Sequence, residues 1–278
     1  MNLHLEGKTA LVTGAGRGIG LAVAQRLAQE GAQVVGTART ITPELEKTAI
    51  AAIPADLATP GGATGAVQSA LDELGGIDIL INNVGGGDAD TLKLGGFLEL
   101  DADDAQWQNM FNLNLFSAVW TSHAALPSLI ERKGSIVSVS SINALIPTPS
   151  PVGYSEAKAA LLAFNKRLSE EFGPRGVRVN TVSPGTVGTG RLRDPDGYGA
   201  RVAAARGMKH EELLAALPSI FKIASGRLTE PEEIADLVVF LASPAASSVV
   251  GANIVADPGW FFRAAVIITL VGGTMFLM

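Results

Sequence analysis

Short apolar segments alternate with longer helical patterns through most of this 278-residue chain. The expected strands are residues 10–12, 33–37, 50–53, 77–81, 135–139, 177–182 and 253–255. Each is apolar rather than alternating, which is typical of strands buried on both faces of a parallel sheet. Strands that alternate with helices form βαβ units. The pattern therefore predicts a doubly wound α/β fold, with helices on both faces of a seven-stranded parallel sheet.

The domain organisation follows from where this pattern stops. With 47% apolar residues the chain can build a large core, and we expect one domain over residues 1–259. Residues 186–227 lack strand signals and contain a helical piece at 211–217, so we expect a substrate lid there, with a plain surface excursion as the alternative. Thr229, Pro231 and Glu232 predict a capped helix start just after it.

Both ends of the chain bear on its location. The C-terminal tail, residues 260–278, is apolar and carries no charge after Arg263. A membrane span needs about 20 apolar residues. Because the uncharged run is shorter than that and is interrupted by Gly272 and Gly273, we expect a packed tail rather than a membrane anchor. Residues 1–8 lack the apolar core of a signal peptide, so we expect a cytoplasmic protein.

The charge and the composition exclude several classes of function. The net charge is −6 and the basic residues are scattered, which argues against a nucleic-acid surface because phosphate binding needs clustered lysines and arginines. There is no cysteine, and the three histidines are isolated, so we expect neither a metal site nor a cysteine nucleophile. Catalysis must therefore use oxygen and nitrogen groups.

A glycine-rich turn follows the first expected strand and leads directly into a helical pattern, residues 21–30. Gly14, Gly18 and Gly20 are separated by three residues and then by one. Glycines let the backbone approach a pyrophosphate closely, and a new helix presents unpaired N–H groups and its positive dipole end to it. In this context the turn predicts a dinucleotide-binding site, and a simple tight turn is the alternative.

The end of the second expected strand indicates which dinucleotide binds. An acidic residue there usually contacts the ribose 2′-hydroxyl of NAD, whereas an arginine accommodates the 2′-phosphate of NADP. This chain has Arg39 at that point, and the first acid is Glu44. Arg39, with Arg17 from the glycine-rich turn, can make charge-assisted bonds to a phosphate. NADP is therefore preferred, unless Arg39 is an ordinary solvated loop residue.

Tyr154 and Lys158 lie four residues apart at the start of a helical stretch that runs to about residue 172. Residues at this spacing share one face of a helix. A free phenol has a pKa near 10, so a nearby cation is needed before it can exchange protons close to neutrality. Such pairs are common by chance and are usually surface pairs, so this spacing requires further context.

Four motifs occur together and in order along the chain. They are the glycine-rich turn, Asn82-Asn83-Val84-Gly85 after the fourth expected strand, Ser141 after the fifth, and Tyr154 with Lys158. Together they resemble the short-chain dehydrogenase/reductase family over roughly residues 5–259, and their joint occurrence is far more specific than any one of them. The resemblance implies a single Rossmann-like domain. The chain departs from the family pattern at Val84, usually alanine, and at Pro258-Gly259, usually two glycines.

The resemblance also implies catalytic roles. Tyr154 is expected to be the general acid/base, and Lys158 its activator and a ligand of the nicotinamide ribose. Ser141 is expected to hydrogen-bond the substrate oxygen, because the family's spacing of thirteen residues before the tyrosine selects it over Ser140, which we interpret as structural. Asn114 matches the asparagine that supports a proton-relay water.

The same resemblance assigns cofactor contacts. Asp56 and Leu57 match a pair that contacts adenine, residues 83–85 match the loop over the adenine ribose, and residues 184–189 match the segment that holds the nicotinamide amide. The full expected set is Gly14, Arg17, Gly18, Ile19, Gly20, Arg39, Asp56, Leu57, Asn83, Val84, Gly85, Tyr154, Lys158, Pro184, Gly185, Val187 and Thr189.

The expected activity is that of an NADP-dependent oxidoreductase, which transfers hydride between the nicotinamide and a small carbonyl or secondary-alcohol substrate in a homotetramer or homodimer. One alternative is reduction of a 3-oxoacyl group on an acyl carrier protein, with Arg132 and Arg175 as candidate contacts. Another is a non-catalytic nucleotide-binding protein, against which the complete catalytic set argues. The substrate is not readable, although lid arginines such as Arg191 could meet an acidic one.

Overall fold

A parallel sheet forms the centre of the computed structural model, which describes residues 1–86, 104–147 and 150–259. The strands are β1 (Thr9–Thr13), β2 (Gln33–Ala38), β3 (Ala51–Pro54), β4 (Ile79–Asn82), β5 (Ser135–Val139), β6 (Arg178–Pro184) and β7 (Asn253–Ala256). They pair in the order β3-β2-β1-β4-β5-β6-β7, and every pairing is parallel. The predicted fold, a single α/β domain with a seven-stranded parallel sheet, is confirmed.

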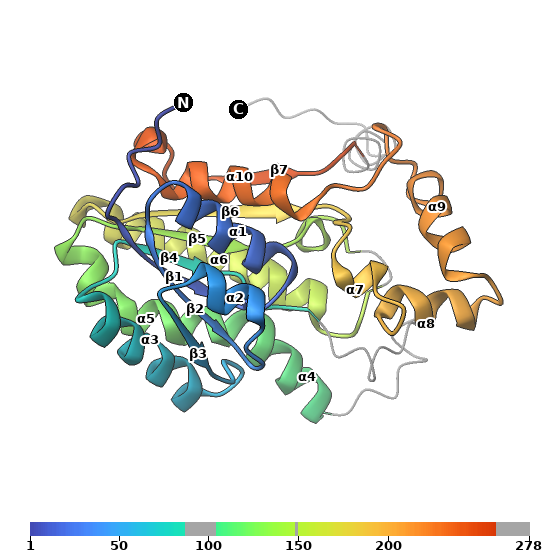
Figure 1. Ribbon diagram of the computed structural model, residues 1–278, viewed down its shortest axis with the longest axis horizontal. Coiled ribbons are helices and arrows are strands. Elements are labelled where there is room, and N and C mark those ends of the chain that lie inside the picture. The colour runs from blue at the N-terminus through green and yellow to red at the C-terminus, as the bar shows by residue number, and fades with distance from the viewer. Residues whose placement is uncertain (87–103, 148–149, 260–278) are drawn as a thin grey trace, which may run out of the picture.

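Helices cover both faces of the sheet. They are α1 (Gly18–Gln29), α2 (Pro43–Thr48), α3 (Pro60–Leu74), α4 (Asp104–Phe111), α5 (Ser117–Glu131), α6 (Tyr154–Phe172), α7 (Gly190–Arg193), α8 (Tyr198–Ala205), α9 (His210–Ile220) and α10 (Pro231–Ala242). α1, α2 and α10 pack on one face and α3, α5 and α6 on the other. In Figure 1, α1 and α10 lie side by side, and α3 and α5 lie across the sheet from them.

The core explains why the strands read as apolar throughout. Val12 and Ile81 pack with α1 and α10, whereas Leu11 and Leu80, one residue earlier, pack with α3 and α5. All four residues are 0% exposed. Burial of each such side chain stabilises the fold by about 1.5–3 kcal/mol relative to leaving it in water. A strand with two buried faces thus needs apolar residues at every position.

The direction in which successive strands are added to the sheet reverses between β1 and β4, which makes this the topological switch point. The chain runs from β1 outward to β2 and β3, and then returns to β4 on the other side of β1. Thr13 joins the two carboxyl ends, since its Oγ1 donates to the Ile81 carbonyl at 3.1 Å and accepts from the Asn83 N–H at 2.9 Å. In open α/β sheets, ligands bind outside the carboxyl ends of the strands at such a point.

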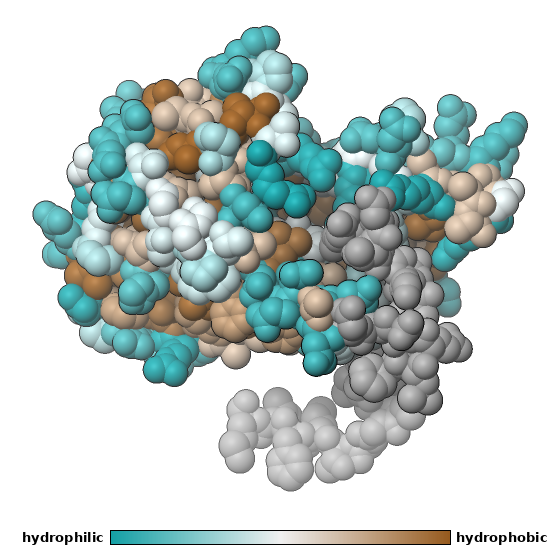
Figure 2. All heavy atoms as spheres, turned by 90° about the horizontal axis from the view of Figure 1, so that it is seen from below, coloured by the Kyte–Doolittle hydropathy of each residue, from teal (hydrophilic) through white to brown (hydrophobic). Residues whose placement is uncertain are grey.

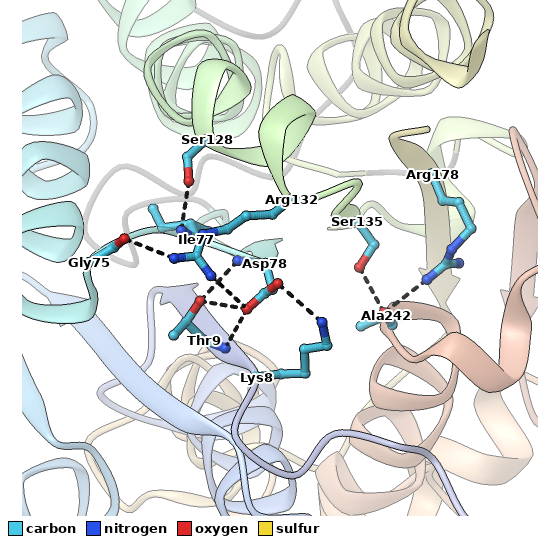
Figure 3. Close-up of polar contacts among 10 residues, drawn as sticks. All are labelled: Lys8, Thr9, Gly75, Ile77, Asp78, Ser128, Arg132, Ser135, Arg178 and Ala242. Carbon is cyan, nitrogen blue, oxygen red and sulfur yellow. Dashed lines mark hydrogen bonds and ion pairs between the residues drawn. The ribbon is translucent and has the colours of Figure 1, made fainter. Parts of the chain in front are cut away.

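The amino ends of β1 and β4, opposite the expected ligand site, are joined by a network of charged and polar side chains (Figure 3). Asp78 accepts from the Thr9 N–H at 3.0 Å and the Thr9 hydroxyl at 2.9 Å, and it pairs with Lys8 at 3.3 Å and Arg132 at 3.5 Å. Burial acts to raise the pKa of Asp78, but the bonds from Thr9 and the charge of Lys8 outweigh it and hold the pKa below its usual value. Arg132, which also donates to the Gly75 carbonyl at 2.8 Å, is thereby a structural residue.

The predicted helix start at Thr229 is wrong by one residue. α10 begins at Pro231, and Glu230 precedes it as the capping residue. The carboxylate of Glu233, three residues on, accepts from the Glu230 N–H at 2.8 Å. Proline favours the first helical position, so it fixes the cap one residue before itself. The Thr229 carbonyl instead accepts from the Gly188 N–H at 2.8 Å, in a bridge that closes the lid segment.

Residues 186–227 contain α7, α8 and α9, which include the predicted helix at 211–217. Together with the next residue, Leu228, they enclose a small core made of Ala203, Leu213, Leu217, Ile223 and Leu228. Figure 2 presents this segment as a separate lobe whose surface in that view is mostly hydrophilic. Within the described ranges, none of the helices has the length and hydropathy required to cross a membrane. The predicted apolar tail, 260–278, lies outside those ranges.

Candidate active site

The glycine-rich turn forms a cradle at the amino end of α1. A Cβ atom at Gly20 would overlap the Gly14 carbonyl, so this approach of backbone to backbone requires glycine. The Asn83 amide donates to the carbonyls of Thr13 at 3.1 Å and Gly14 at 3.2 Å, which fixes the turn. The first turn of α1 contains no acidic residue. Its unpaired N–H groups and its positive dipole end therefore suit a pyrophosphate, and the residues present fit the predicted dinucleotide.

Two arginines lie on adjacent loops beside the cradle. The Thr42 hydroxyl donates to the Gly16 carbonyl at 3.1 Å, and this bond holds the loop after β2 against the glycine-rich turn. Arg17 follows Gly16, and Arg39 follows β2; both side chains are exposed. Among the described residues, neither guanidinium has an ion-pair partner. Both charges are therefore available for a phosphate.

The predicted adenine contacts lie after β3, at the same edge of the sheet. Asp56 is exposed, and its carboxylate accepts from the Ala58 N–H at 3.1 Å. Leu57 is only 3% exposed and packs with Ala63 and Ala66. The two residues therefore have different structural roles, because Asp56 faces solvent while Leu57 packs beneath the loop.

The segment 184–189 crosses above the start of α1. The Gly185 N–H donates to the Ala256 carbonyl at 3.0 Å, and Val187 forms a bridge with Thr229. A Cβ at Gly18 would lie 3.3 Å from the Thr189 methyl group. Residues from both segments line an open pocket of about 420 Å³. Of the predicted pyrophosphate and nicotinamide contacts, Gly18 and Thr189 line this opening.

Asn114 lies on a turn of π-helix, Asn112–Phe116, between α4 and α5. Its side chain is 1% exposed and clamps one residue of the loop after β4. The Asn114 Oδ1 accepts from the Gly86 N–H, and Nδ2 donates to the Gly86 carbonyl, both at 2.8 Å. Single π-helical turns are frequent at functional sites. Asn114 therefore fixes the backbone that borders the predicted catalytic groups.

Lys158 reaches the same loop from α6. Its Nζ donates to the Val139 carbonyl at 2.9 Å, and the residue is 2% exposed. Burial lowers the pKa of Lys158 to about 8. A Cβ at Gly85 would lie 2.7 Å from this Nζ and 2.9 Å from the Asn114 Oδ1, so only glycine fits between the two.

Tyr154 begins α6, one turn before Lys158, and the Ser141 hydroxyl, which accepts from the Asn143 N–H at 3.2 Å, influences the pKa of its phenol. Burial raises the pKa of Tyr154, while Ser141 and the charge of Arg191 act in the opposite direction without reversing the rise. The role of Lys158 as the cation that lowers this pKa stays a prediction. The neighbouring Ser140 turns away and donates to the Lys158 carbonyl at 3.1 Å, in keeping with a structural role.

Sequence reasoning did not single out Arg191, which it named only as one of several lid arginines. In the structure the charge of this residue acts to lower the pKa of the Tyr154 phenol, whereas Arg193, two positions on, pairs with Glu230 at 2.6 Å. Two residues on one short helix thus face different surroundings. No sequence signal distinguishes them, because the difference depends on how the lid packs.

Comparison with known proteins identifies the family. The family model described as Enoyl-(Acyl carrier protein) reductase matches residues 14–260. The 3-oxoacyl-[acyl-carrier-protein] reductase FabG of Vibrio cholerae serotype O1 is 33% identical over 265 residues, which cover 93% of this chain and 99% of that protein. The chain belongs to the short-chain dehydrogenase/reductase family. Oxidoreductase UcpA of Escherichia coli (strain K12) is 34% identical over 268 residues, 92% of this chain and 95% of its own length.

Solved structures agree with this assignment. L-sorbose reductase from Gluconobacter frateurii, complexed with NADPH and L-sorbose, superposes with a TM-score of 0.84 at 31% identity, over 94% of this chain and 99% of that one. The aldohexose dehydrogenase of Thermoplasma acidophilum has a TM-score of 0.82 at 27% identity, over 95% and 97%. The family predicted from the sequence is confirmed, and the protein is an NAD(P)-dependent short-chain dehydrogenase/reductase.

Proposed function

We propose that this enzyme reduces a small carbonyl compound with NADPH, with Tyr154 as the general acid. The observation that carries the proposal is the placement of Tyr154 at the start of α6, one helical turn before the buried amine of Lys158, whose Nζ donates to the Val139 carbonyl at the end of β5. The cradle that would hold the cofactor opens beside them at the carboxyl ends of β1 and β4. A proton donor, an oxygen-binding group and a cofactor cradle at one edge of the sheet suit carbonyl reduction.

NADPH, when bound, supplies the hydride that adds to the carbonyl carbon. The Ser141 hydroxyl donates to the carbonyl oxygen and stabilises the negative charge that develops there. Tyr154 transfers its phenolic proton to that oxygen, and the product is the alcohol. Lys158 and Asn114 keep the loop at residues 85–86 in place, so that the reacting groups are held in register.

The preference for NADP rests on Arg17 and Arg39. Two exposed guanidinium groups on adjacent loops suit the charge of a 2′-phosphate, which NAD lacks. The L-sorbose reductase that this chain resembles was solved with NADPH. The remaining proposed contacts are Asp56, Leu57, residues 83–85 and 184–185, Val187 and Thr189. Residues 186–227 are proposed as the substrate lid of a catalytic domain at 1–259.

Reduction of a 3-oxoacyl group on an acyl carrier protein is the alternative, because the Vibrio cholerae relative carries that name. Of the two predicted carrier contacts, Arg132 is held by Asp78, and Arg175 is exposed and lies over the Phe172 ring at 5.9 Å. Arg132 is exposed as well, but its charge is engaged by Asp78, so we propose Arg175 as the contact for an acidic partner. A location in the cytoplasm accords with either reaction.

A carbonyl panel tests the proposal. The purified enzyme is mixed with NADPH and with sugars, simple ketones, oxo acids and 3-oxoacyl thioesters of carrier protein and of pantetheine, and the loss of NADPH absorbance is followed. We expect turnover of at least one small carbonyl compound. Turnover of the carrier-bound thioester alone would favour the alternative, and binding of NADPH without turnover of any compound would indicate a non-catalytic nucleotide-binding protein.

A further inference from the structure

Met110, on α4, lies between the two segments that carry Asn114 and Tyr154, and its side chain is half-buried. The Asn114 Nδ2 donates to the Met110 carbonyl and lies against the Met110 Sδ, both at 3.0 Å, and it donates to the Gly86 carbonyl at 2.8 Å. An amide nitrogen carries two hydrogens, so three acceptors surround its donor end. Met110 therefore helps to fix the orientation of the amide that holds Gly86.

The same side chain supports the start of α6. Gly153, the residue before Tyr154, is buried and has a φ of 78°, a conformation that suits glycine. A Cβ there would lie 3.3 Å from the Met110 Cβ and Cγ and 3.1 Å from a ring carbon of Trp107, so α4 packs closely on this backbone. The Gly153 carbonyl accepts from the Ala157 N–H at 3.0 Å, in the first turn of α6. The contact thus fixes where the helix that carries Tyr154 begins.

One side chain therefore connects both halves of the candidate site. On one side is the loop that Asn114 holds, which lies against Lys158 at Gly85. On the other side is the backbone that carries Tyr154. A misplacement of about 1 Å can cost on the order of 10²-fold in rate. Methionine suits such a place, because its unbranched chain fills irregular gaps and its sulfur is a weak acceptor.

We propose that Met110 is a positioning residue for carbonyl reduction, which sets the start of α6, and with it Tyr154, relative to the loop that Asn114 holds. The inference rests on the proposed function, because it concerns the same reaction. Met110 transfers neither the proton nor the hydride. It acts through the placement of Tyr154.

Rates per binding site separate positioning from a loss of folded enzyme. In Met110→Ala, which leaves a gap on both sides, kcat per NADPH-binding site should fall at least about tenfold, while KM and NADPH affinity change less than about threefold. Met110→Leu keeps most of the apolar volume and should stay within about threefold of the wild-type kcat. Ile130→Ala is the matched control, since Ile130 is also half-buried and packs near the far end of α5. An unchanged kcat in Met110→Ala, or an equal fall in the control, would overturn the inference.

A double-mutant cycle shows whether the effect passes through the proton donor. In a Tyr154→Phe background the group that Met110 positions is gone, so adding Met110→Ala should lower the residual rate less than about threefold. A further loss as large as that in the wild-type background would place the action of Met110 elsewhere and would refute the inference.

The phenol itself gives a readout that does not depend on turnover. The chain has two tyrosines, so Tyr198→Phe leaves Tyr154 as the single phenol, and its ionisation can be followed by tyrosinate absorbance. Burial raises the pKa of Tyr154, and Met110→Ala should bring that pKa back toward its ordinary value as the gap admits water. Met110→Leu and Ile130→Ala should leave it unchanged. Absence of all carbonyl reduction would refute the proposed function, whereas an unchanged pKa in Met110→Ala would refute the role of Met110.

Discussion

Tyr154 must hold a proton at neutral pH and release it within the site. Burial raises the pKa of its phenol, so the group stays protonated through the neutral range. We expect carbonyl reduction, which consumes that proton, to be insensitive to pH near neutrality and to fall in the alkaline range as the phenol ionises. Alcohol oxidation needs the phenolate and should rise with pH over the same range. Initial rates in both directions, measured from neutral to alkaline pH, check this. Parallel profiles would contradict it.

Arg39 allows a direct test of cofactor choice. Arg39→Ala removes one of the two exposed charges beside the glycine-rich turn and leaves the turn unchanged. A bond to a charged group contributes about 1.5–3 kcal/mol, which corresponds to roughly a 10- to 100-fold loss of NADPH affinity. The affinity for NADH should remain within about twofold.

Fluorescence titration of both cofactors measures these affinities. Lys47→Ala, which removes an exposed cation from α2, is the control and should leave both unchanged. Equal affinities of the wild type for NADPH and NADH would show that the reading of the second strand end is mistaken.

At the scale of elements, Arg178 connects β6 to the end of α10. Its Nη1 donates to the Leu241 carbonyl at 2.8 Å and the Ala246 carbonyl at 3.2 Å, and its Nη2 donates to those of Ala242 at 2.9 Å and Ser243 at 3.1 Å. The last carbonyls of a helix lack partners within the helix. Ser135 also donates to the Ala242 carbonyl, at 2.7 Å (Figure 3).

Arg178→Met should therefore destabilise the protein by about 2–4 kcal/mol, because it leaves partly buried carbonyls without donors. Arg167→Met is the matched control, since the Arg167 side chain is 81% exposed and its pair with Glu171 spans 3.8 Å. It should change the free energy of unfolding by less than about 0.5 kcal/mol. Urea denaturation of both variants measures the difference, and equal midpoints would contradict the assignment.

The elements differ in how far the sequence predicts them. Each expected strand is present, because strands buried on both faces, such as β1 and β4, leave an apolar run, and the partly buried edge strands β3 and β7 are also largely apolar. The start of α6 at Tyr154 was also predicted. The cap at Thr229 was not, because two polar residues precede Pro231 and only the geometry of the proline chooses between them.

The candidate site likewise contains some residues that the sequence predicts and others that it does not. Residues in local motifs, such as Gly20 and Lys158, are predictable because the turn or the helix itself fixes their geometry. Arg191 lies 37 residues after Tyr154 in the chain. The effect of its charge on the pKa of Tyr154 depends on how the lid packs, which no local pattern encodes. The ion pair between Arg132 and Asp78 likewise depends on tertiary structure, so the sequence alone does not predict it.

At the scale of the whole molecule, α4 packs against the start of α6 but leaves much of its surface uncovered by the described residues. Within the described ranges α4 buries none of its residues, although it carries Trp107 and Phe111, whose rings lie 6.3 Å apart. We expect α4, α5 and α6 to form the interface of a homotetramer or homodimer, since aromatic side chains that are only partly buried favour association. Light scattering should give two or four times the 28.6 kDa of one chain. The mass of a single chain at micromolar concentration would contradict this.

The central claim is that Tyr154 is the general acid, and Tyr154→Phe tests it most directly. The change removes one proton-bearing oxygen and almost no volume, so NADPH affinity and the unfolding temperature should stay close to those of the wild type. Loss of a general acid costs on the order of 10²- to 10⁴-fold in rate. We expect kcat for the best carbonyl substrate to fall at least about 100-fold. Retention of more than about a tenth of wild-type kcat, with the fold intact, would contradict the mechanism.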